Sequence, residues 1–267
     1  MRMIATDLDG TLLGPTGVVS KRNIAALRAA RAAGIQIVLA TGRPPFMATA
    51  VLEQLGDIVG HGVLANGSLV CEYPSGTALR TIRLDIDRAV AAIEHLRRMD
   101  ATLGFALATD AGFAHEPGFA ERMPAAQPGP PVADVLEVVR NGTVALKVMA
   151  FSSAATAHEL LRSLPPLLPG DIGVTHMGAD CVEIGPTGID KGSALSWLCA
   201  QLGVDAAGVV AFGDEFNDHE MLHWAGHAVV MGNASPETKA FASEIAPSNA
   251  DDGVAVVIEA LLASRWR

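Results

Sequence analysis

Two aspartates, Asp7 and Asp9, lie two residues apart near the start of a chain of 267 residues. They follow the short apolar segment Met3-Ile4-Ala5. If that segment is a strand, side chains at positions i and i+2 project to the same side, so the two carboxylates would crowd one point at the end of the strand. Such like charges raise the free energy unless a bound cation or a raised pKa offsets the repulsion. The spacing of Asp7 and Asp9 therefore indicates a catalytic or cation-binding site.

Polar groups also follow other predicted strands. In an open parallel sheet, ligands bind beyond the carboxyl ends of the strands, so we expect these groups to gather at one edge. A further group, Asp190-Lys191-Gly192, stands at the start of a predicted helix. The strand-end groups are Asp7 and Asp9 with Gly10-Thr11, Thr41-Gly42-Arg43, Asn66-Gly67, and Gly213-Asp214 with Asn217-Asp218. Of these, Asn66-Gly67 is more typical of a turn than of a ligand site.

The first third of the chain alternates strand and helix. Ser20 is a good N-cap for a helix over 21–33, a buried strand follows over 35–40, and Pro44-Pro45 suits the first turn of a second helix. This alternation predicts an α/β fold with a parallel sheet and right-handed crossovers. Two β-rich runs come next, and Pro74-Ser75-Gly76 between them predicts a hairpin.

The middle of the chain has a different pattern, which predicts an inserted α+β domain over 84–186. Helices are expected over 85–99 and 153–164 and strands over 102–109 and 143–151, while no structure is predicted for 116–131. After Gly188 the strand–helix alternation returns. The prediction is therefore a discontinuous α/β domain over 1–83 and 187–267, with hinges near Arg83-Leu84 and Pro186-Thr187-Gly188.

Composition excludes several classes of protein. Half of the residues are apolar and 18% are charged, which is typical of a chain with a large buried core. The net charge of −10 argues against a nucleic-acid or anionic-membrane partner, because both need a basic surface. No membrane-spanning run or signal peptide is visible. The three cysteines lack metal-ligand spacing and indicate buried thiols in a reducing compartment, so we expect a cytoplasmic protein.

Four motifs in order resemble those of the haloacid dehalogenase-like (HAD) phosphatases, specifically the Cof-like branch with a C2B-type cap. They are "DLDGTLL" from Asp7, "TGR" from Thr41, "DKGSAL" from Asp190 and "GDEFND" from Gly213. "ANGSLV" and the extended "GDEFNDHEML" are similar to that branch as well, and the match runs from Asp7 to "SNADDGVA" near the end. The resemblance implies a Rossmann-like core with an inserted cap. It also implies a Mg²⁺-dependent phosphatase for small phosphomonoesters, with sugar phosphates as the expected substrates.

The resemblance assigns roles to the acidic residues. Asp7 corresponds to the nucleophile, which attacks the phosphoryl group and forms an aspartyl-phosphate. Asp9 corresponds to the general acid and base, which protonates the leaving alcohol and then activates water. The implied Mg²⁺ ligands are Asp7, the backbone carbonyl of Asp9 and Asp214. Asp218 is either a further ligand or a support for the ligands.

Other residues are candidates for binding the phosphoryl group, whose oxygens need hydrogen-bond donors and positive charge. Thr41 offers a hydroxyl, Gly42 offers a backbone N–H, and Lys191, one of only four lysines, offers a full charge at a helix start. Asn217 resembles the family position that hydrogen-bonds the phosphate and orients the lysine. Arg43 either contacts substrate or pairs with an acidic loop.

Three alternatives remain at this point. The enzyme could be a phosphatase for a nucleotide-like or flavin-pathway phosphate, or a phosphomutase that returns the phosphate to its substrate. The third alternative is a non-catalytic module that senses a metabolite, although the intact set Asp7, Asp9, Lys191 and Asp214 argues against it. In each case the expected partner is a small phosphorylated metabolite, and the sequence does not predict an oligomeric state.

Overall fold

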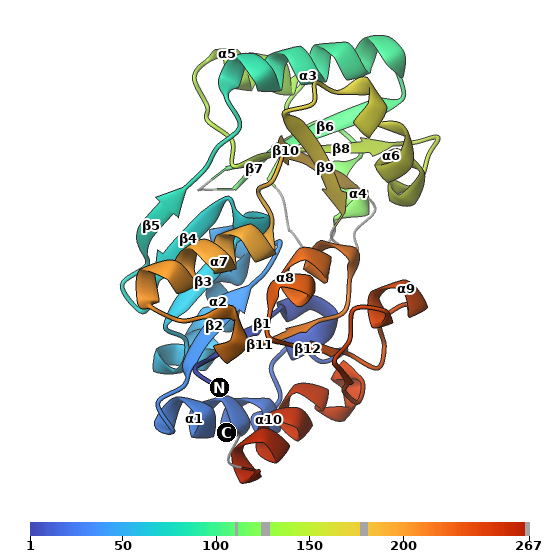
Figure 1. The fold of residues 1–267 in the computed structure, drawn as a ribbon. Coiled ribbons are helices and arrows are strands. Elements are labelled where there is room, and N and C mark those ends of the chain that lie inside the picture. Colours follow the sequence, from blue (N-terminus) through green and yellow to red (C-terminus); the bar gives the residue numbers. More distant parts are fainter. Residues whose placement is uncertain (110–111, 124–128, 177–180, 265–267) are drawn as a thin grey trace. The chain divides into compact units, whose positions relative to one another are not determined.

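The computed structural model describes residues 1–109, 112–123, 129–176 and 181–264. The chain divides into two compact units, which are described separately (Figure 1). Unit 1 consists of Met1–Arg43, Ala48–Thr81 and Asp190–Arg267, and unit 2 consists of Pro44–Met47 and Ile82–Ile189. The four residues Pro44–Met47 thus group with unit 2, although they lie inside the predicted segment 1–83. The predicted domain limits stay a prediction.

Unit 1 is built on a mixed sheet of eight strands in the order β13-β12-β11-β1-β2-β3-β4-β5. The strands from β13 to β3 run parallel, and β4 and β5 are added by antiparallel hairpins. This arrangement confirms the predicted α/β fold and the hairpin at Pro74-Ser75-Gly76. The strands are β1 (Met3–Thr6), β2 (Gln36–Ala40), β3 (His61–Leu64), β4 (Leu69–Glu72), β5 (Thr77–Thr81), β11 (Val209–Gly213), β12 (His227–Val230) and β13 (Glu244–Ile245).

The helices of unit 1 connect these strands. Ser20 caps the first helix as predicted, because its hydroxyl accepts a hydrogen bond from the Asn23 N–H at 3.0 Å. The helices are α1 (Lys21–Ala32), α2 (Pro45–Leu55), whose residues up to Met47 group with unit 2, α7 (Lys191–Leu202), α8 (His219–Trp224), α9 (Pro236–Lys239) and α10 (Gly253–Ala263). Short helical turns are η1 (Leu8–Leu12), η2 (Gly56–Ile58), η3 (Ala65–Gly67), η6 (Ala206–Gly208), η7 (Phe216–Asp218) and η8 (Asn249–Asp251).

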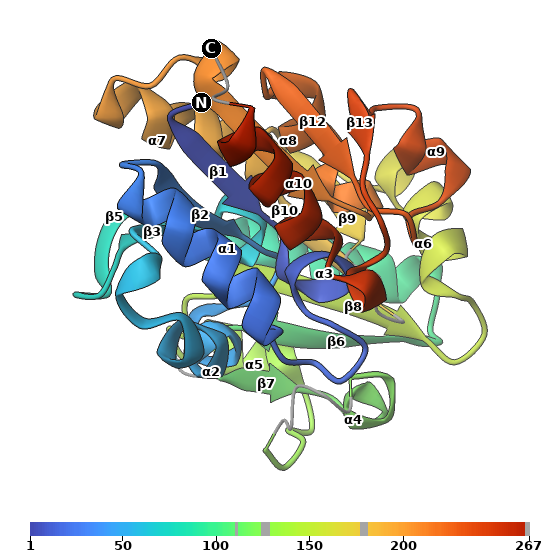
Figure 2. The same cartoon turned by 90° about the horizontal axis from the view of Figure 1, so that it is seen from below.

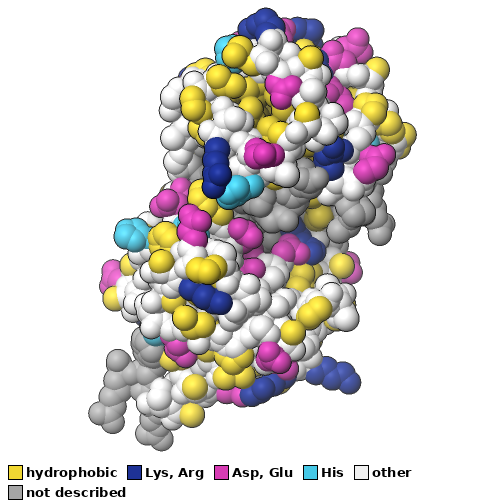
Figure 3. Space-filling view, turned by 90° about the vertical axis from the view of Figure 1, so that its right-hand side faces the viewer, with side chains coloured by type: hydrophobic (Ala, Val, Ile, Leu, Met, Phe, Trp, Pro, Cys, Tyr) yellow, Lys and Arg dark blue, Asp and Glu magenta, His cyan; other side chains and the backbone are white. Residues whose placement is uncertain are grey.

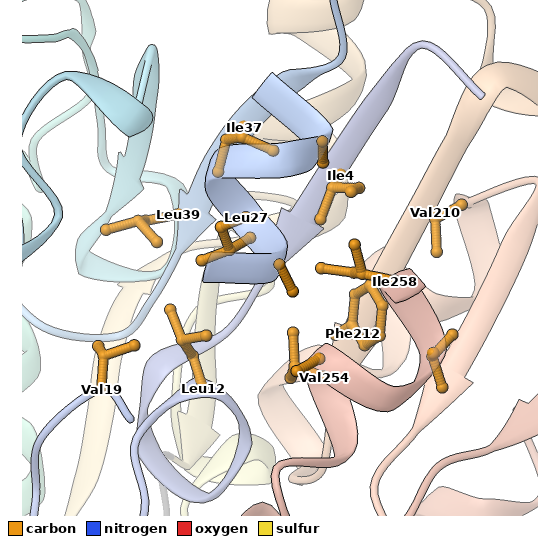
Figure 4. Packing of buried hydrophobic residues seen from close by; sticks show 14 of the residues in the cluster. Ile4, Leu12, Val19, Leu27, Ile37, Leu39, Val210, Phe212, Val254 and Ile258 are labelled. Carbon is orange, nitrogen blue, oxygen red and sulfur yellow. The ribbon is translucent and has the colours of Figure 1, made fainter. Parts of the chain in front are cut away.

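Both faces of this sheet are buried, and the alternation of side chains along β1 shows why. Ile4 points to the face covered by α1 and α10, which lie side by side in Figure 2, and it packs near Ile258 of α10 in Figure 4. Met3 and Ala5 point to the opposite face, which is covered by α7 and α8. Each fully buried aliphatic side chain contributes about 1.5–3 kcal/mol of transfer free energy. The two apolar layers thus fix β1 in the middle of the sheet and position the residues that follow it.

Unit 2 has an antiparallel sheet in the order β7-β6-β8-β10-β9. The predicted helices and strands of this region are present, together with short elements that the sequence did not predict. The strands are β6 (Leu103–Ala108), β7 (Phe113–His115), β8 (Lys147–Ser152), β9 (Ile172–His176) and β10 (Val182–Pro186). The helical segments are α3 (Ile86–Met99), α4 (Phe119–Arg122), α5 (Val135–Arg140), α6 (Ala157–Ser163) and η5 (Pro165–Leu167).

The two faces of the unit 2 sheet differ in composition. One face packs against α3, α5 and α6 through aliphatic side chains (Figure 1). The other face carries a row of aromatic contacts that we name the aromatic cluster: Phe46, Phe113, Phe119 and Phe151. Phe113 lies 5.1 Å from both Phe46 and Phe119, and Phe119 lies 5.9 Å from Phe151, measured between ring centroids. The chain has only eight phenylalanines, so half of them are gathered here.

The surface and the cysteines agree with the composition. On the face shown in Figure 3, Lys and Arg side chains are scattered among Asp and Glu, without a basic patch. Cys71, Cys181 and Cys199 are buried thiols that take part in no disulfide bond, in line with the prediction. Within the described ranges, no helix has the length and apolar character needed to cross a membrane.

Candidate active site

The chain leaves the sheet immediately before the first aspartate. β1 ends at Thr6, and Asp7 is still tied to the neighbouring strand because its N–H donates to the Phe212 carbonyl at 3.0 Å. Gly10 then adopts a φ of 77°, which turns the chain into η1. The expected crowding of Asp7 and Asp9 on one strand face is therefore wrong. The Asp7 side chain is buried, whereas that of Asp9 is 50% exposed, because Asp9 lies past the strand in the turn.

Lys191 joins two of the carboxylates. It is the first residue of α7, and Asp190 caps that helix by accepting a hydrogen bond from the Ser193 N–H at 2.7 Å. The Lys191 side chain is fully buried, and its Nζ lies 2.6 Å from Asp7 Oδ1 and 2.7 Å from Asp218 Oδ1. Burial alone would lower the pKa of Lys191, but the carboxylates of Asp218 and Asp7 outweigh it and raise that pKa. Lys191 is therefore a buried cation between two carboxylates.

Both carboxylate oxygens of Asp218 are already occupied. Oδ1 accepts from Lys191, and Oδ2 accepts from the N–H groups of Asp214 at 2.9 Å and Glu215 at 3.1 Å. Gly213 makes this close approach possible, since a Cβ on Gly213 would lie 2.6 Å from the Cβ of Asp218. Asp218 thereby fixes the loop that carries Asp214.

Asp214 is held by two residues whose role the sequence did not predict. Its Oδ1 accepts from the Thr11 hydroxyl at 2.6 Å, and the Asn233 amide, 3.4 Å from Oδ2, also donates to the Gly10 carbonyl at 2.9 Å. A Cβ on Gly10 would collide with the Asp214 carboxylate. The strand-end rule had placed Thr11 in the group that begins with Asp7 without giving it a role, and the same rule could have found Asn233, which follows β12.

The carboxylates of Asp7, Asp214 and Asp218 form a group that could hold a metal ion. One oxygen from each lies within 4.8 Å of the others. Burial raises the pKa of Asp7 well above its ordinary value despite the opposing charge of Lys191, and the nearby carboxylates add to the increase. Burial also raises the pKa of Asp214 to about 7. Three carboxylates facing one lysine leave an excess of negative charge, which a cation would neutralise.

The predicted phosphate-binding residues lie on neighbouring strand ends of unit 1. Thr41 is buried after β2, and its hydroxyl accepts from the Arg43 N–H at 3.1 Å; Gly42, between them, is also buried. The guanidinium of Arg43 forms a bidentate ion pair with the carboxylate of Asp9. Its Nε donates to Oδ2 at 2.8 Å and its Nη2 to Oδ1 at 2.6 Å. Of the two roles considered for Arg43, pairing with an acidic loop is therefore the one that the structure displays.

Asn217 makes a different contact from the one that the resemblance implied. Its amide donates to Asn66 Oδ1 at 2.9 Å, while Lys191 Nζ donates to the carboxylates of Asp7 and Asp218. Asn66 lies in a turn, with a φ of 50°, as the sequence predicted. It also contributes a buried side chain to the site, which the sequence did not indicate.

Comparisons with known proteins agree with this fold and these motifs. The family of haloacid dehalogenase-like hydrolases matches residues 4–258. The pyridoxal phosphate phosphatase YbhA of Escherichia coli (strain K12) is 34% identical over 96% of this chain and 97% of its own length. The 5-amino-6-(5-phospho-D-ribitylamino)uracil phosphatase YwtE of Bacillus subtilis (strain 168) is 28% identical over the full length of both.

A solved structure is similar as well. The crystal structure of a haloacid dehalogenase-like hydrolase from Bacteroides thetaiotaomicron is 28% identical, with a TM-score of 0.82 over 97% of this chain and 99% of that one. The chain therefore belongs to the haloacid dehalogenase-like hydrolase family. The predictions of this family, of its fold and of an enzyme of its phosphatase type are confirmed.

Proposed function

We propose that this protein hydrolyses small phosphomonoesters, with Asp7 as the nucleophile that forms an aspartyl-phosphate. The observation that carries the proposal is the arrangement around Asp7. Lys191 holds its Oδ1 at 2.6 Å, and the described residues offer no hydrogen bond to its Oδ2. One oxygen is thus oriented while the other remains available to attack a phosphoryl group in line with its leaving oxygen. Lys191, Thr41 and the Gly42 N–H supply positive charge and donors for the phosphoryl oxygens.

Asp9 is the proposed general acid and base. In the structure its carboxylate accepts two hydrogen bonds from the guanidinium of Arg43. A phosphate is a competing partner for the same guanidinium, so substrate binding would draw Arg43 away and free Asp9 to carry a proton. Asp9 would then protonate the leaving alkoxide and later take a proton from the water that hydrolyses the aspartyl-phosphate. In this proposal Arg43 contacts both the acidic loop and the substrate.

The residues present fit a divalent cation, and Mg²⁺ is the ion that we propose. The candidate ligands are carboxylate oxygens, which suit a hard cation, and three carboxylates face one lysine. Asp7, Asp214 and the backbone carbonyl of Asp9 would hold the ion. Asp218 would act as their support, because hydrogen bonds already occupy both of its oxygens. The bound ion would supply charge that neutralises the phosphoryl oxygens.

For the substrate, we propose a phosphate ester of a planar heterocycle in preference to a sugar phosphate. The relatives YbhA and YwtE are named for pyridoxal phosphate and for a phosphoribitylaminouracil, and both compounds contain such a ring. Unit 2, the expected cap, carries the aromatic cluster, in which Phe46 comes only three residues after Arg43 along the chain. Aromatic rings stack on planar rings with about 0.5–1.5 kcal/mol beyond the burial of area. This supports the alternative of a nucleotide-like or flavin-pathway phosphate.

Release of inorganic phosphate tests the reaction and the substrate class together. Wild-type protein should release phosphate from a panel of esters in the presence of Mg²⁺ but not of EDTA, and faster from pyridoxal 5′-phosphate than from glucose 6-phosphate. Asp7→Asn should lower turnover by at least about 10³-fold, because the nucleophile is lost. The exposed Asp205→Asn is the control and should keep full activity. Full activity of Asp7→Asn would refute the mechanism, and an isomerised ester without free phosphate would indicate a phosphomutase.

A further inference from the structure

A cavity of about 420 Å³ lies within unit 2, apart from the residues assigned to catalysis. The start of β6, the end of β8 and the segment from Glu116 to Arg122 line it, and none of the predicted catalytic or phosphate-binding residues does so. Its volume falls in the range of sites for small metabolites. The question is which chemical group its side chains would accept.

Two arginines line the cavity, and one of them is neutralised within the protein. Arg97 donates from Nη1 to Asp134 Oδ1 at 2.9 Å, and its Nη2 is paired with Glu116. Glu116 is itself buried and accepts hydrogen bonds from the N–H groups of Phe105 and Val135. The charge of Arg97 is therefore neutralised by Asp134 and Glu116, and it needs no ligand.

Arg122 differs from Arg97 because its hydrogen-bond acceptors are backbone carbonyls and not carboxylates. Its positive charge is therefore not neutralised by an ion pair. Nη1 donates to the Gly118 carbonyl at 2.9 Å and Nη2 to the Ser152 carbonyl at 2.8 Å, and both acceptors are neutral. The guanidinium lies over the Phe151 ring, 5.2 Å from its centroid. Among the described residues no carboxylate pairs with Arg122, and its buried Nε has no hydrogen-bond partner.

A half-buried guanidinium without a carboxylate partner is rare. Burial of an unpaired charge and of an unpaired N–H raises the free energy of the folded protein. The two carbonyl contacts hold the fork of Arg122 in a fixed orientation at the cavity wall. A fixed guanidinium fork matches the two oxygens of a carboxylate or a phosphate. Phe151 and Leu103 in the same wall offer apolar surface beside that charge.

We propose that this cavity is a binding site for a small organic oxyanion, whose charged group pairs with Arg122 and whose carbon skeleton packs against Phe151. Apart from Phe151 of the aromatic cluster, no residue that the proposed function uses lines this cavity, and the proposal does not depend on the proposed reaction. A carboxylate and a phosphate share the required chemistry, so the test uses one probe of each kind.

Chemical-shift titration of the isotopically labelled full-length protein tests the proposal. Sodium succinate and sodium phosphate are added in separate experiments, while the amides of Gly118 and Ser153 report on the cavity and those of Gly42 and Lys191 report on the catalytic site. We expect saturable shifts of Gly118 and Ser153 with at least one probe. A response to succinate alone assigns a carboxylate, and a response to phosphate alone assigns a phosphate.

Two variants identify the group responsible. Arg122→Gln should weaken binding at the cavity by at least about tenfold, since a charge-assisted hydrogen bond is lost. Because Arg122 also donates to two backbone carbonyls, its replacement could disturb the fold, so a second variant keeps those contacts. Ser153→Asp places a carboxylate in the cavity wall that competes with the ligand for Arg122. It should abolish ligand binding and, by pairing with Arg122, raise the melting temperature. The exposed Arg140→Gln is the matched control and should bind as the wild type does.

The outcomes separate this proposal from the proposed function. Shifts of Gly42 and Lys191 with no saturable shift of Gly118 and Ser153 would overturn the cavity site and leave the phosphatase proposal standing. Unchanged binding at the cavity in both Arg122→Gln and Ser153→Asp would overturn the role of Arg122. Cavity binding in a protein that hydrolyses no ester would support the site while the proposed function fails.

Discussion

Lys191 connects Asp7, the proposed nucleophile, to the rest of the site, because its charge is shared by the buried carboxylates of Asp7 and Asp218. The pairing also has a structural role. If the ammonium group were removed, two carboxylates would remain buried close to each other without a counter-charge. Breaking a buried ion pair from one side costs about 3–5 kcal/mol, more than the pair itself contributes.

We therefore expect Lys191→Met to lower the free energy of unfolding by about 3–5 kcal/mol and to abolish phosphate release. Urea denaturation measures the first effect and an ester assay the second. Lys21→Met, at an exposed position at the start of α1, is the control and should leave both unchanged. A stable and active Lys191→Met protein would show that the lysine is dispensable.

Asp214 makes metal binding dependent on pH. Its pKa of about 7 means that the carboxyl group is largely neutral below pH 7, and a neutral carboxyl is a poor ligand. A proton therefore competes with the ion as the pH falls. We expect the apparent Mg²⁺ affinity, measured by calorimetric titration, to fall by at least about tenfold per pH unit below 7, since Asp7, whose pKa is raised as well, adds to the competition from protons. Asp214→Asn should bind weakly at every pH, and an affinity of the wild type that does not change between pH 5.5 and 7.5 would contradict this assignment.

At the scale of elements, the turn from β1 into η1 depends on a glycine for two reasons. Gly10 has a positive φ, and the carboxylate of Asp214 occupies the space where a Cβ would lie. Gly17 offers a matched comparison, because its φ of 76° is nearly the same as the 77° of Gly10 while nothing lies within 4 Å of a Cβ there. The two positions separate backbone strain from displacement of Asp214.

Both Gly10→Ala and Gly17→Ala should lose about 1–2 kcal/mol of stability, which is the cost of the left-handed conformation for a residue with a Cβ. Only Gly10→Ala should also weaken Mg²⁺ binding and lower kcat, by at least about tenfold, because it displaces a ligand. Denaturation, calorimetric titration and the ester assay check the three effects. Equal activity of the two variants would mean that Asp214 tolerates the displacement.

The strand-end rule explains what the sequence could predict about the site and where it failed. It located Asp7, Thr41 and Asp214, because apolar runs of four or five residues mark the buried strands and the polar residue after each run stands at the edge. The rule failed for Asp9, because the prediction that Asp7 and Asp9 project to the same side required a strand that continues past Thr6, and β1 ends there. The bond between Asn66 and Asn217 joins residues 151 positions apart, and no local pattern encodes such a contact.

The inserted region was less predictable for a physical reason. β7, β9 and β10 contain three to five residues each, which is too short for a clear alternation of apolar and polar positions. Their places in the sheet are set by their partners: β7 pairs with β6, β10 with β8, and β9 with β10. Helices α3 and α6 were predictable because caps mark where they start: Asp85 caps α3, and Thr156 and Glu159 form a capping box for α6.

At the scale of the whole molecule, each unit has an apolar core of its own. Chains with separate cores often depart from two-state unfolding. We expect two transitions in calorimetry, of which only one shifts to higher temperature when Mg²⁺ and inorganic phosphate are added, because a ligand stabilises the part that binds it. Asp214→Asn should remove that shift and leave the other transition in place. A single transition that moves as a whole would show that the two cores unfold together.

The position of β1 between β2 and β11 has a consequence for the synthesis of this enzyme. Asp7 is translated 184 positions before Lys191, and Asp218 comes later still. Until β11 has been translated, one edge of β1 lacks its partner strand and the nucleophile lacks its counter-charge. While unit 2 is being made, the nascent chain therefore carries Asp7 without its partners, and the proposed site is complete only after the segment from Lys191 to Asp218 has folded onto β1.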